Sequence, residues 1–205
     1  MSGFDAIAHA MTTIATGGFS TYNASLAHFK SATIEYICVI FMLIGSLPFV
    51  LYLRAIRGNP KPLFRDDQVR LFLLIVVIAV FVLAYYRYVA GTDIFTALRE
   101  AAFNVVSIIT GTGYATADYG TWGPFALIAF FFLMFVGGCA GSTTCGIKVF
   151  RFQVLYATAL TQIRRLLKPH GVYLAYYNRR PIPEEVSASV MAFFFLYALS
   201  YGVIA

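Results

Sequence analysis

Charged residues are scarce in this chain of 205 residues: they make up 12% of it, against about 25% in soluble domains. Hydrophobic residues make up 60%, and the mean hydropathy is +0.77. A soluble fold of this length cannot bury so much apolar surface. The net charge of +6 could indicate nucleic-acid binding, but the basic residues lie between apolar runs. We therefore expect an integral membrane protein with the lipid bilayer as a partner and no bound nucleic acid.

Groups for covalent or metal chemistry are also few. The three cysteines, Cys38, Cys139 and Cys145, have no metal-binding spacing, and an odd number cannot all pair within one chain. We interpret them as small apolar side chains. The apolar runs contain no cluster of His, Asp and Glu and no Ser/His pairing, so we expect neither an enzyme nor an organic cofactor. The first residues lack the basic and apolar regions of a signal peptide.

Four apolar runs predict membrane spans, at residues 33–53, 71–90, 123–136 and 186–205. About 20 apolar residues are needed to cross a bilayer as a helix, and we expect Pro48 to kink the first run. Residues 3–14 and 92–109 are too short or too polar to span and predict short helices. The pattern indicates an all-α integral membrane fold.

Each short helix leads into a loop rich in Gly and Thr, A-T-G-G-F-S at 15–20 and T-G-T-G-Y-A at 110–115. Irregular backbone at membrane depth is tolerated only where it is buried in protein or lines a watery path. Gly accepts positive φ, so such a loop can direct carbonyl oxygens at a desolvated cation, with Thr hydroxyls adding to them. The alternative is a pair of ordinary glycine turns between helices. The candidate filter residues are Ala15, Thr16, Gly17, Gly18, Thr110, Gly111, Thr112 and Gly113.

The third apolar run ends in G-G-C-A-G-S-T-T-C-G, residues 137–146, which contains no bulky apolar side chain. We interpret it as an irregular loop facing the pore, although small residues also form close helix–helix contacts. The candidate gate residues are Gly137, Gly138, Ala140, Gly141, Ser142, Thr143, Thr144 and Gly146. Lys148 and Arg151 follow as possible gate or partner contacts, although a lysine at this place ordinarily extends to the interface.

An internal repeat and the distribution of charge predict the topology. Gly18 and Gly113 align at an offset of 95 residues, and each repeat has a short helix, a Gly-rich loop and an apolar run. Twelve of the 15 basic residues fall on one side of the predicted membrane, and Lys30, Arg87 and Arg99 fall on the other. The positive-inside rule then places the twelve in the cytoplasm and both Gly-Thr loops outside.

Three motifs together resemble the TrkH/KtrB family of bacterial potassium-uptake subunits in the Trk/Ktr/HKT superfamily. They are A-M-T-T-I-A-T-G-G-F-S at 10–20, I-I-T-G-T-G-Y-A-T at 108–116 and F-V-G-G-C-A-G-S-T-T-C-G-I-K-V-F-R at 135–151. The resemblance implies potassium-channel-like units of span, pore helix, filter loop and span around a pseudo-fourfold pore. It makes Gly18 and Gly113 the critical filter glycines and residues 137–146 the gating loop. It also implies K⁺ as the transported ion, a homodimer, a cytosolic nucleotide-binding subunit similar to TrkA or KtrA, and a multi-pass protein of the bacterial cytoplasmic (inner) membrane.

By this resemblance the chain contains part of a four-unit protein and lacks two of its filter loops. Residues 1–57 are the pore helix, filter loop and inner span of unit two, 58–70 a cytoplasmic loop, 71–151 a complete unit three, 152–185 a basic cytoplasmic linker, and 186–205 the start of unit four. The expected function is potassium uptake through a carbonyl-lined filter that an intramembrane loop gates. An alternating-access secondary cation transporter is the alternative, because broken helices also hold substrates in such proteins.

Overall fold

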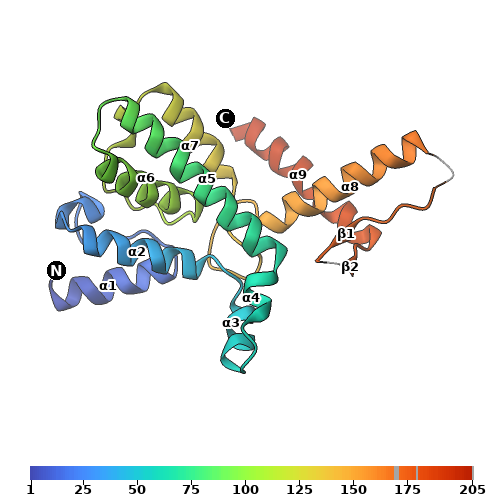
Figure 1. The fold of residues 1–205 in the computed structure, drawn as a ribbon, viewed down its shortest axis with the longest axis horizontal. Helices are drawn as coiled ribbons and strands as arrows, with labels where there is room; N and C mark the ends of the chain where they lie inside the picture. The colour runs from blue at the N-terminus through green and yellow to red at the C-terminus, as the bar shows by residue number, and fades with distance from the viewer. Residues whose placement is uncertain (169–170, 179, 205) are drawn as a thin grey trace. The chain divides into compact units, whose positions relative to one another are not determined.

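The structure, a computed structural model, describes residues 1–168, 171–178 and 180–204 (Figure 1). Its contacts divide the chain into two compact units, Met1–Val149 and Phe150–Ala205. Arg179, one of the twelve basic residues placed in the cytoplasm, lies outside the described residues, as does Ala205, the expected end of the last span.

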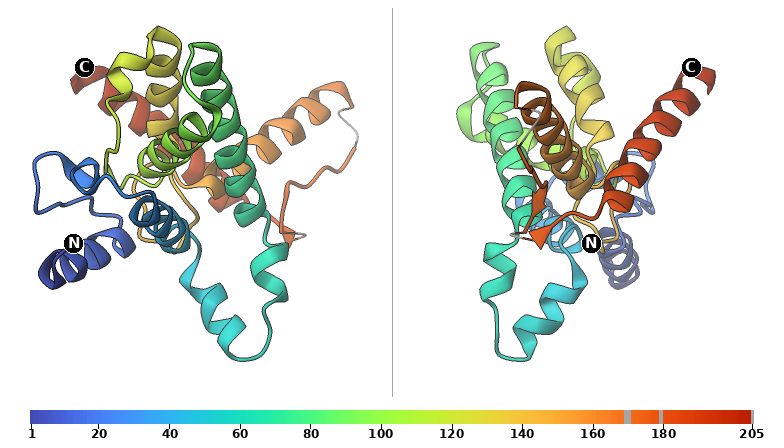
Figure 2. Two further views of the ribbon diagram at one scale, coloured as in Figure 1. Left: turned by 60° about the vertical axis from the view of Figure 1, so that its left-hand side comes forward. Right: turned by 90° about the vertical axis from the view of Figure 1, so that its right-hand side faces the viewer.

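The first unit is helical. Its elements are α1 (Gly3–Ile14), the 3₁₀ helix η1 (Ser25–Phe29), α2 (Ala32–Gly45), α3 (Phe49–Ile56), α4 (Lys61–Arg65), α5 (Asp67–Val89), α6 (Ile94–Ile109), the 3₁₀ helix η2 (Tyr119–Trp122) and α7 (Pro124–Phe135). Helix α6 packs against α2, α5 and α7, and α1 packs against α2 (Figure 2).

Helices α1 and α6, which precede the two Gly-Thr loops, have 12 and 16 residues. At a rise of 1.5 Å per residue they are roughly 18 and 24 Å long, short of the ~30 Å apolar core of a bilayer. Their sequences explain where they begin. Asp93 accepts hydrogen bonds from the backbone N–H groups of Phe95 and Thr96, and Ser2 and Asp5 form a capping box.

Asp5 is a buried carboxylate at the start of α1. It accepts hydrogen bonds from the hydroxyls of Ser2 (2.6 Å), Thr21 (2.7 Å) and Tyr22 (3.3 Å). The hydrogen bonds from Ser2 and then Thr21 lower the pKa of Asp5 to about 2. The carboxylate in turn raises the pKa of Tyr22, chiefly through its charge. The cluster ties the chain after the first loop to the start of the helix before it.

Two ion pairs hold α6 in place. Arg99 on α6 pairs with Glu35 at the start of α2 (3.3 Å), and Glu100 on α6 pairs with Arg87 at the end of α5 (2.8 Å). The Arg87 guanidinium also lies 4.7 Å from the centre of the Trp122 ring. Glu35, which the sequence placed at the start of a span, is therefore a partner of the second short helix.

The first expected span, 33–53, is not one continuous helix. Helix α2 ends at Gly45, α3 begins at Phe49, and the two axes differ by 93°. The expectation of a kink was too mild. Pro48 has no N–H to donate and restricts the preceding residue, so the helix stops before it and restarts after it.

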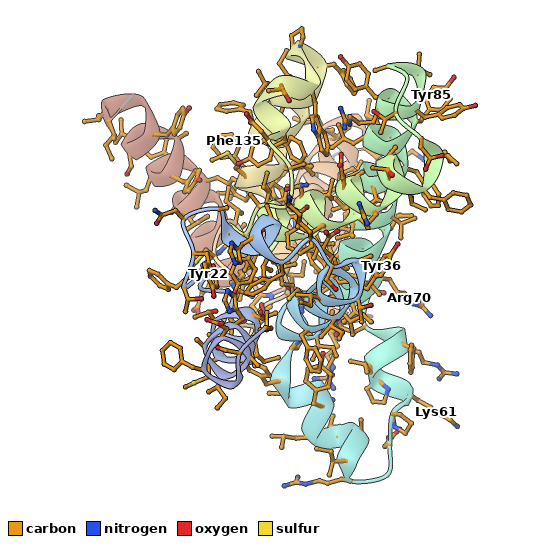
Figure 3. All side chains as sticks on the ribbon, turned by 90° about the vertical axis from the view of Figure 1, so that its left-hand side faces the viewer. Tyr22, Tyr36, Lys61, Arg70, Tyr85 and Phe135 are labelled. Atoms are coloured by element: carbon orange, nitrogen blue, oxygen red, sulfur yellow. The ribbon has the colours of Figure 1, made fainter. Side chains whose placement is uncertain are left out.

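Two of the other expected spans, 71–90 and 186–205, are long helices with adjusted ends, whereas the expected span at 123–136 is a shorter helix. By length and composition, α5 and α9 (Glu184–Ile204) can each cross a membrane, and α2 with α3 forms a third if the bent pair is counted as one. Helix α7 has 12 residues and is too short to cross alone. Figure 3 shows Lys61 at the end of the unit formed by α3 and α4, Arg70 nearer the middle, and Tyr85 toward the opposite end. Lys61 and Tyr85 thus lie on the two sides of the predicted membrane to which the distribution of basic residues assigns them.

The second unit contains α8 (Val149–Leu167), the strands β1 (Tyr176–Tyr177) and β2 (Arg180–Pro181), and α9. The strands pair antiparallel, with Tyr176 opposite Pro181. This short hairpin and an isolated parallel bridge between Val136 and Ile147 are small departures from the all-α prediction. Arg151 lies 3.9 Å from the Phe193 ring centre, which joins α8 to α9.

Candidate cation-filter site

The two Gly-Thr loops adopt the same backbone pattern. Residues 16 and 18 of the first loop have positive φ (50° and 68°), and so do Gly111 and Gly113 of the second (71° and 85°). The residues between them, Gly17 and Thr112, do not. The loops are therefore related structures at the offset of 95 residues, not two dissimilar turns.

The loops also touch each other. A Cβ atom added to Gly18 would stand 1.8 Å from the carbonyl oxygen of Thr112. Only glycine allows two backbones to approach this closely. At Gly113, an added Cβ would meet no atom of the described residues within 4 Å. The sequence prediction that the two loops meet at a common place agrees with this contact.

Several carbonyl oxygens of the loops have no donor. Those of residues 16–18 and 110–113 accept no hydrogen bond from the described residues. The Ala15 carbonyl accepts the Thr16 hydroxyl at 2.8 Å. Backbone carbonyls inside proteins nearly always have partners. These oxygens are therefore available to water or a cation.

The threonine hydroxyls of the loops have protein partners. Thr16, Thr110 and Thr112 are buried, and the hydroxyls of Thr110 and Thr112 lie 2.7 Å apart. The sequence-based expectation gave these hydroxyls a share in binding the cation. In this structure they bond within the loops and leave the carbonyls as the oxygens without a donor.

Each loop is fastened to its own short helix by the same bond. The Thr12 hydroxyl donates to the Phe19 carbonyl (3.0 Å), and the Ser107 hydroxyl donates to the Tyr114 carbonyl (2.6 Å). These four residues form two pairs related by the offset of 95 residues. In each pair the acceptor is the carbonyl of the residue directly after the filter glycine.

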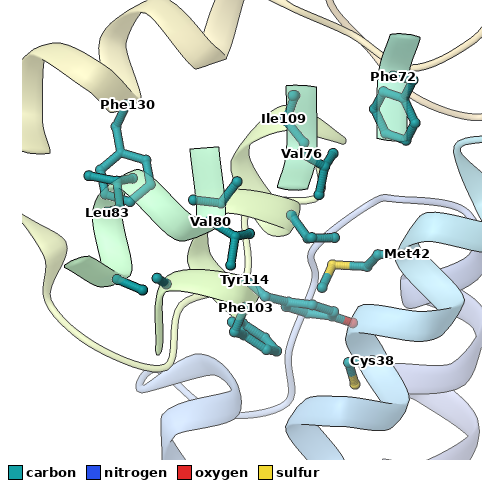
Figure 4. Close-up of a cluster of buried hydrophobic side chains, with 14 of the residues drawn as sticks. Cys38, Met42, Phe72, Val76, Val80, Leu83, Phe103, Ile109, Tyr114 and Phe130 are labelled. Carbon is teal, nitrogen blue, oxygen red and sulfur yellow. The ribbon is translucent and has the colours of Figure 1, made fainter. Parts of the chain in front are cut away.

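The second loop also reaches the first short helix through Tyr114. This residue is 1% exposed, and Figure 4 shows its ring between Phe103 and Met42 in the buried cluster. Its hydroxyl lies 2.5 Å from the Thr12 hydroxyl and 3.4 Å from the His9 carbonyl. Tyr114 therefore joins the two repeats.

Residues 137–146 form an irregular loop with a hydrogen-bonded neck. Gly137 N–H donates to the Ile147 carbonyl (2.9 Å), and Ile147 N–H donates to the Phe135 carbonyl (3.0 Å). An added Cβ on Gly137 would stand 2.1 Å from the Cys145 carbonyl oxygen. Glycine is needed here because the two ends of the loop are in backbone contact.

This loop pairs with the break between α2 and α3. Cys139 N–H donates to the Ser46 carbonyl (3.0 Å), and Thr143 N–H donates to the Gly45 carbonyl (3.2 Å). In return, Phe49 N–H donates to the Gly141 carbonyl (3.0 Å). Each irregular segment thus satisfies backbone groups that the other leaves without helical partners.

The loop also contacts the residue just before the first candidate filter segment and the second segment itself. The Thr143 hydroxyl lies within hydrogen-bond distance of the Ile14 carbonyl (3.1 Å) and the Gly45 carbonyl (3.0 Å). On the other side, an added Cβ on Gly111 would stand 3.1 Å from the Cβ of Cys145. The structure therefore brings 15–18, 110–113 and 137–146 together in the first unit.

Lys148 turns back onto the loop. Its ammonium group donates to the Thr144 carbonyl and lies 2.9 Å from the Thr144 hydroxyl. The Thr144 hydroxyl also accepts from Gly138 N–H (3.0 Å). Arg151, the other residue predicted as a gate or partner contact, packs on Phe193 in the second unit.

Sequence reasoning missed four residues of this site. Gly45 and Ser46 hold the loop, Gln68 accepts from Ala140 N–H (2.8 Å), and Tyr114 joins the repeats. The segment G-S-L-P at 45–48 is typical of a helix break, which could have indicated Gly45 and Ser46. Tyr114 could have been found from its position directly after the filter glycine Gly113. Gln68, three residues before the apolar run that begins at residue 71, gave no indication of this contact.

The fold and the site define the class: an integral membrane protein of mainly helical structure, with short helices that end in paired glycine loops. The chain belongs to the TrkH family of cation transport proteins, whose family model it matches over residues 1–204.

Individual relatives agree with this assignment. The chain is 44% identical to the Trk system potassium uptake protein TrkI of Halomonas elongata, over all of this chain and 42% of the relative. It is 37% identical to TrkH of Escherichia coli K12, over 99% of this chain and 43% of the relative. The crystal structure of the potassium transporter TrkH from Vibrio parahaemolyticus superimposes with a TM-score of 0.92 at 36% identity, covering 99% of this chain and 44% of that one.

The chain thus spans less than half the length of the relatives it matches. These relatives are transport proteins, in agreement with the prediction that the chain is not an enzyme. The predicted multi-pass membrane fold and the predicted family are confirmed.

Proposed function

We propose that the chain forms part of a potassium-uptake pore and contributes two of the loops of its selectivity filter. The single observation that carries this proposal is the set of carbonyls at residues 16–18 and 110–113, which accept no hydrogen bond from the described residues and lie on two loops in contact. A cation that leaves water needs oxygens in place of its hydration shell, and backbone carbonyls supply them. The names of the relatives support K⁺ as the transported ion.

We infer that residues 137–146 act as the gate of this pore. The loop bonds to the carbonyl before Ala15, to Gly45 in the break of α2 and α3, and to Lys148 after its own end. These bonds join the loop to its neighbours and are not bonds within a helix, so a displacement of the loop leaves the bonds inside the helices in place. The loop can therefore obstruct or release the path without unfolding the helices.

The remaining assignments follow from the family resemblance. They are the bacterial inner membrane, filter loops that face outside, a homodimer, and a cytosolic nucleotide-binding subunit that shifts the gate. The charge asymmetry of the loops supports the orientation. The boundaries of units two, three and four remain those predicted from the repeat.

The test is ion flux in liposomes with the protein expressed from its full coding sequence. Gly113→Ser should lower the preference for K⁺ over Na⁺, because a side chain at φ of +85° strains the backbone of the loop and so shifts its carbonyls. Gly91→Ser is the matched control, since Gly91 also has positive φ (+94°) and open surroundings but lies in the turn after α5. Unchanged selectivity in Gly113→Ser would count against the filter.

The paired breaks favour one alternative, an alternating-access cation transporter, because discontinuous helices form substrate sites in such proteins. The same liposomes separate the two mechanisms. A pore gives flux that rises steadily with K⁺ concentration, whereas a carrier saturates at low turnover and couples to a second ion.

A further inference from the structure

The Tyr114 hydroxyl bridges two repeats that are distant in sequence. It is 2.5 Å from the Thr12 hydroxyl oxygen, and the Thr12 hydroxyl lies 3.0 Å from the Phe19 carbonyl. The Thr13 hydroxyl is 3.4 Å away. The ring itself is buried in the hydrophobic cluster around Met42 and Cys38 (Figure 4). The carbonyls of His9 and Phe19 each lie 3.4 Å from the Tyr114 hydroxyl, so the Thr12 hydroxyl is its nearest partner.

The hydroxyls of Tyr114 and Thr12 gather at the Phe19 carbonyl. Each hydroxyl has one proton to donate and lone pairs to accept. The Thr12 hydroxyl lies 3.0 Å from the Phe19 carbonyl and 3.0 Å from the Ala8 carbonyl, and the Tyr114 hydroxyl lies 3.4 Å from the Phe19 carbonyl. When Tyr114 donates to Thr12, the Thr12 proton is left for one of these two carbonyls, and donation to Phe19 completes a relay from Tyr114 through Thr12 to the first loop.

Phe19 follows Gly18 directly, so the direction of its carbonyl affects the peptide groups of the first filter loop. In the second loop the Ser107 hydroxyl holds the Tyr114 carbonyl in the same way (2.6 Å). Tyr114 thus has two roles at once. Its carbonyl is held by its own short helix, and its hydroxyl supports the corresponding bond in the preceding repeat.

We propose that Tyr114 is a positioning residue for ion selectivity: through Thr12 it orients the Phe19 carbonyl and thereby holds the oxygens of the first filter loop at a spacing suited to K⁺. The inference rests on the proposed function. It extends that function by making the geometry of one loop depend on a side chain of the other. The backbone contact between Gly18 and Thr112 provides a second link at the same place.

Tyr114→Phe tests the relay, because it keeps the buried ring and removes the hydroxyl. The protein is expressed from its full coding sequence, and K⁺ and Na⁺ fluxes are measured in liposomes. We expect the K⁺/Na⁺ ratio to fall roughly fivefold, the order that one buried hydrogen bond contributes. Tyr119→Phe is the matched control: Tyr119 lies in η2, and its ring packs 4.8 Å from Phe130.

Variants of Thr12 provide a second test, which is independent of whether Tyr114→Phe folds. Thr12→Val, which keeps the shape, should lower the ratio as Tyr114→Phe does, and Thr12→Ser, which keeps the hydroxyl, should restore it. The double variant Tyr114→Phe with Thr12→Val should be no worse than either single one. A structural role alone would lower yield or stability and leave the ratio unchanged.

The outcomes separate this inference from the filter proposal. If Gly113→Ser lowers selectivity while Tyr114→Phe and Thr12→Val leave it unchanged, the relay is refuted and the filter stands. If none of the three changes the ratio, the filter assignment fails and the relay fails with it.

Discussion

Gly18 and Thr112 lie in direct backbone contact, with the Thr112 carbonyl oxygen 1.8 Å from where a Cβ of Gly18 would stand. The two residues are in loops that follow different short helices, α1 and α6. Their contact is what makes the two loops one site. The contact also means that the two filter glycines differ in their tolerance of a side chain, because an added Cβ would meet open space at Gly113 and the Thr112 carbonyl at Gly18.

Gly18→Ala should therefore be far more damaging than a change that only strains the backbone. The new methyl group has to displace the Thr112 carbonyl, so we expect at least a tenfold loss of K⁺ flux or of folded protein. Gly91→Ala, at a φ of +94° with open surroundings, should cost only about 1 kcal/mol. Flux in liposomes and the size-exclusion profile in detergent measure the two effects. Equal behaviour of the two variants would contradict the contact.

Thr143→Val should loosen the loop 137–146 and raise flux in the absence of any regulatory partner. The hydroxyl that valine lacks lies between the carbonyls of Ile14 and Gly45. Loss of about 1 kcal/mol of net hydrogen bonding predicts a rise of roughly fivefold in basal flux. Thr161→Val, which removes a bond from the Thr161 hydroxyl to the Ala157 carbonyl in α8, is the control. Lower flux in Thr143→Val would indicate that the loop supports the path and does not obstruct it.

Lys148→Met should have a larger effect in the same direction. The ammonium group bonds to the Thr144 carbonyl and hydroxyl, and hydrogen bonds to charged groups contribute about 1.5–3 kcal/mol. We expect basal flux to rise about tenfold or more, and Lys148→Arg to restore part of the wild-type behaviour. The reading is wrong if the methionine variant conducts like the wild type at equal protein density.

The Asp5 cluster predicts a pH dependence of stability. The pKa of Asp5 is about 2 in the folded chain, below its ordinary value of 3.8, so the carboxylate stabilises the fold above pH 4. That contribution should be lost as the pH falls from about 4 to about 2. Wild type and Asp5→Asn should therefore differ in unfolding temperature at pH 6, and the difference should shrink as the pH falls from about 4 to about 2, as measured in detergent. A difference that stays constant over this range would place the role of Asp5 elsewhere.

Much of the fold could be predicted from local patterns. Helix α1 has the predicted bounds, and α5, α6 and α9 start or end within a few residues of the expected positions. The repeat at 95 residues predicted two loops of one kind, and Thr16 with Gly111 and Gly18 with Gly113 share their φ pattern. These features depend on hydropathy, helix length and the conformational freedom of glycine, all of which are properties of short segments.

The partners of the irregular segments could not be predicted in this way. Pro48 indicated a kink, but the 93° bend and the bonds of Gly45 and Ser46 to 137–146 depend on chain more than 90 residues away. The same holds for the Tyr114 hydroxyl on Thr12 and for the mutual bond of Thr110 and Thr112. Backbone groups outside helices have no fixed partner along the sequence, so only packing decides which donor reaches which carbonyl.

By itself, the sequence determined that this chain lies in a membrane, that it repeats, and where its glycine loops and broken run occur, because each of these depends on the transfer of residues from water to lipid or on local backbone freedom. The tertiary structure decided that the two loops touch, that two helix breaks satisfy each other, and that one tyrosine connects the repeats. Those relationships arise from hydrogen bonds between distant segments, for which no local pattern exists.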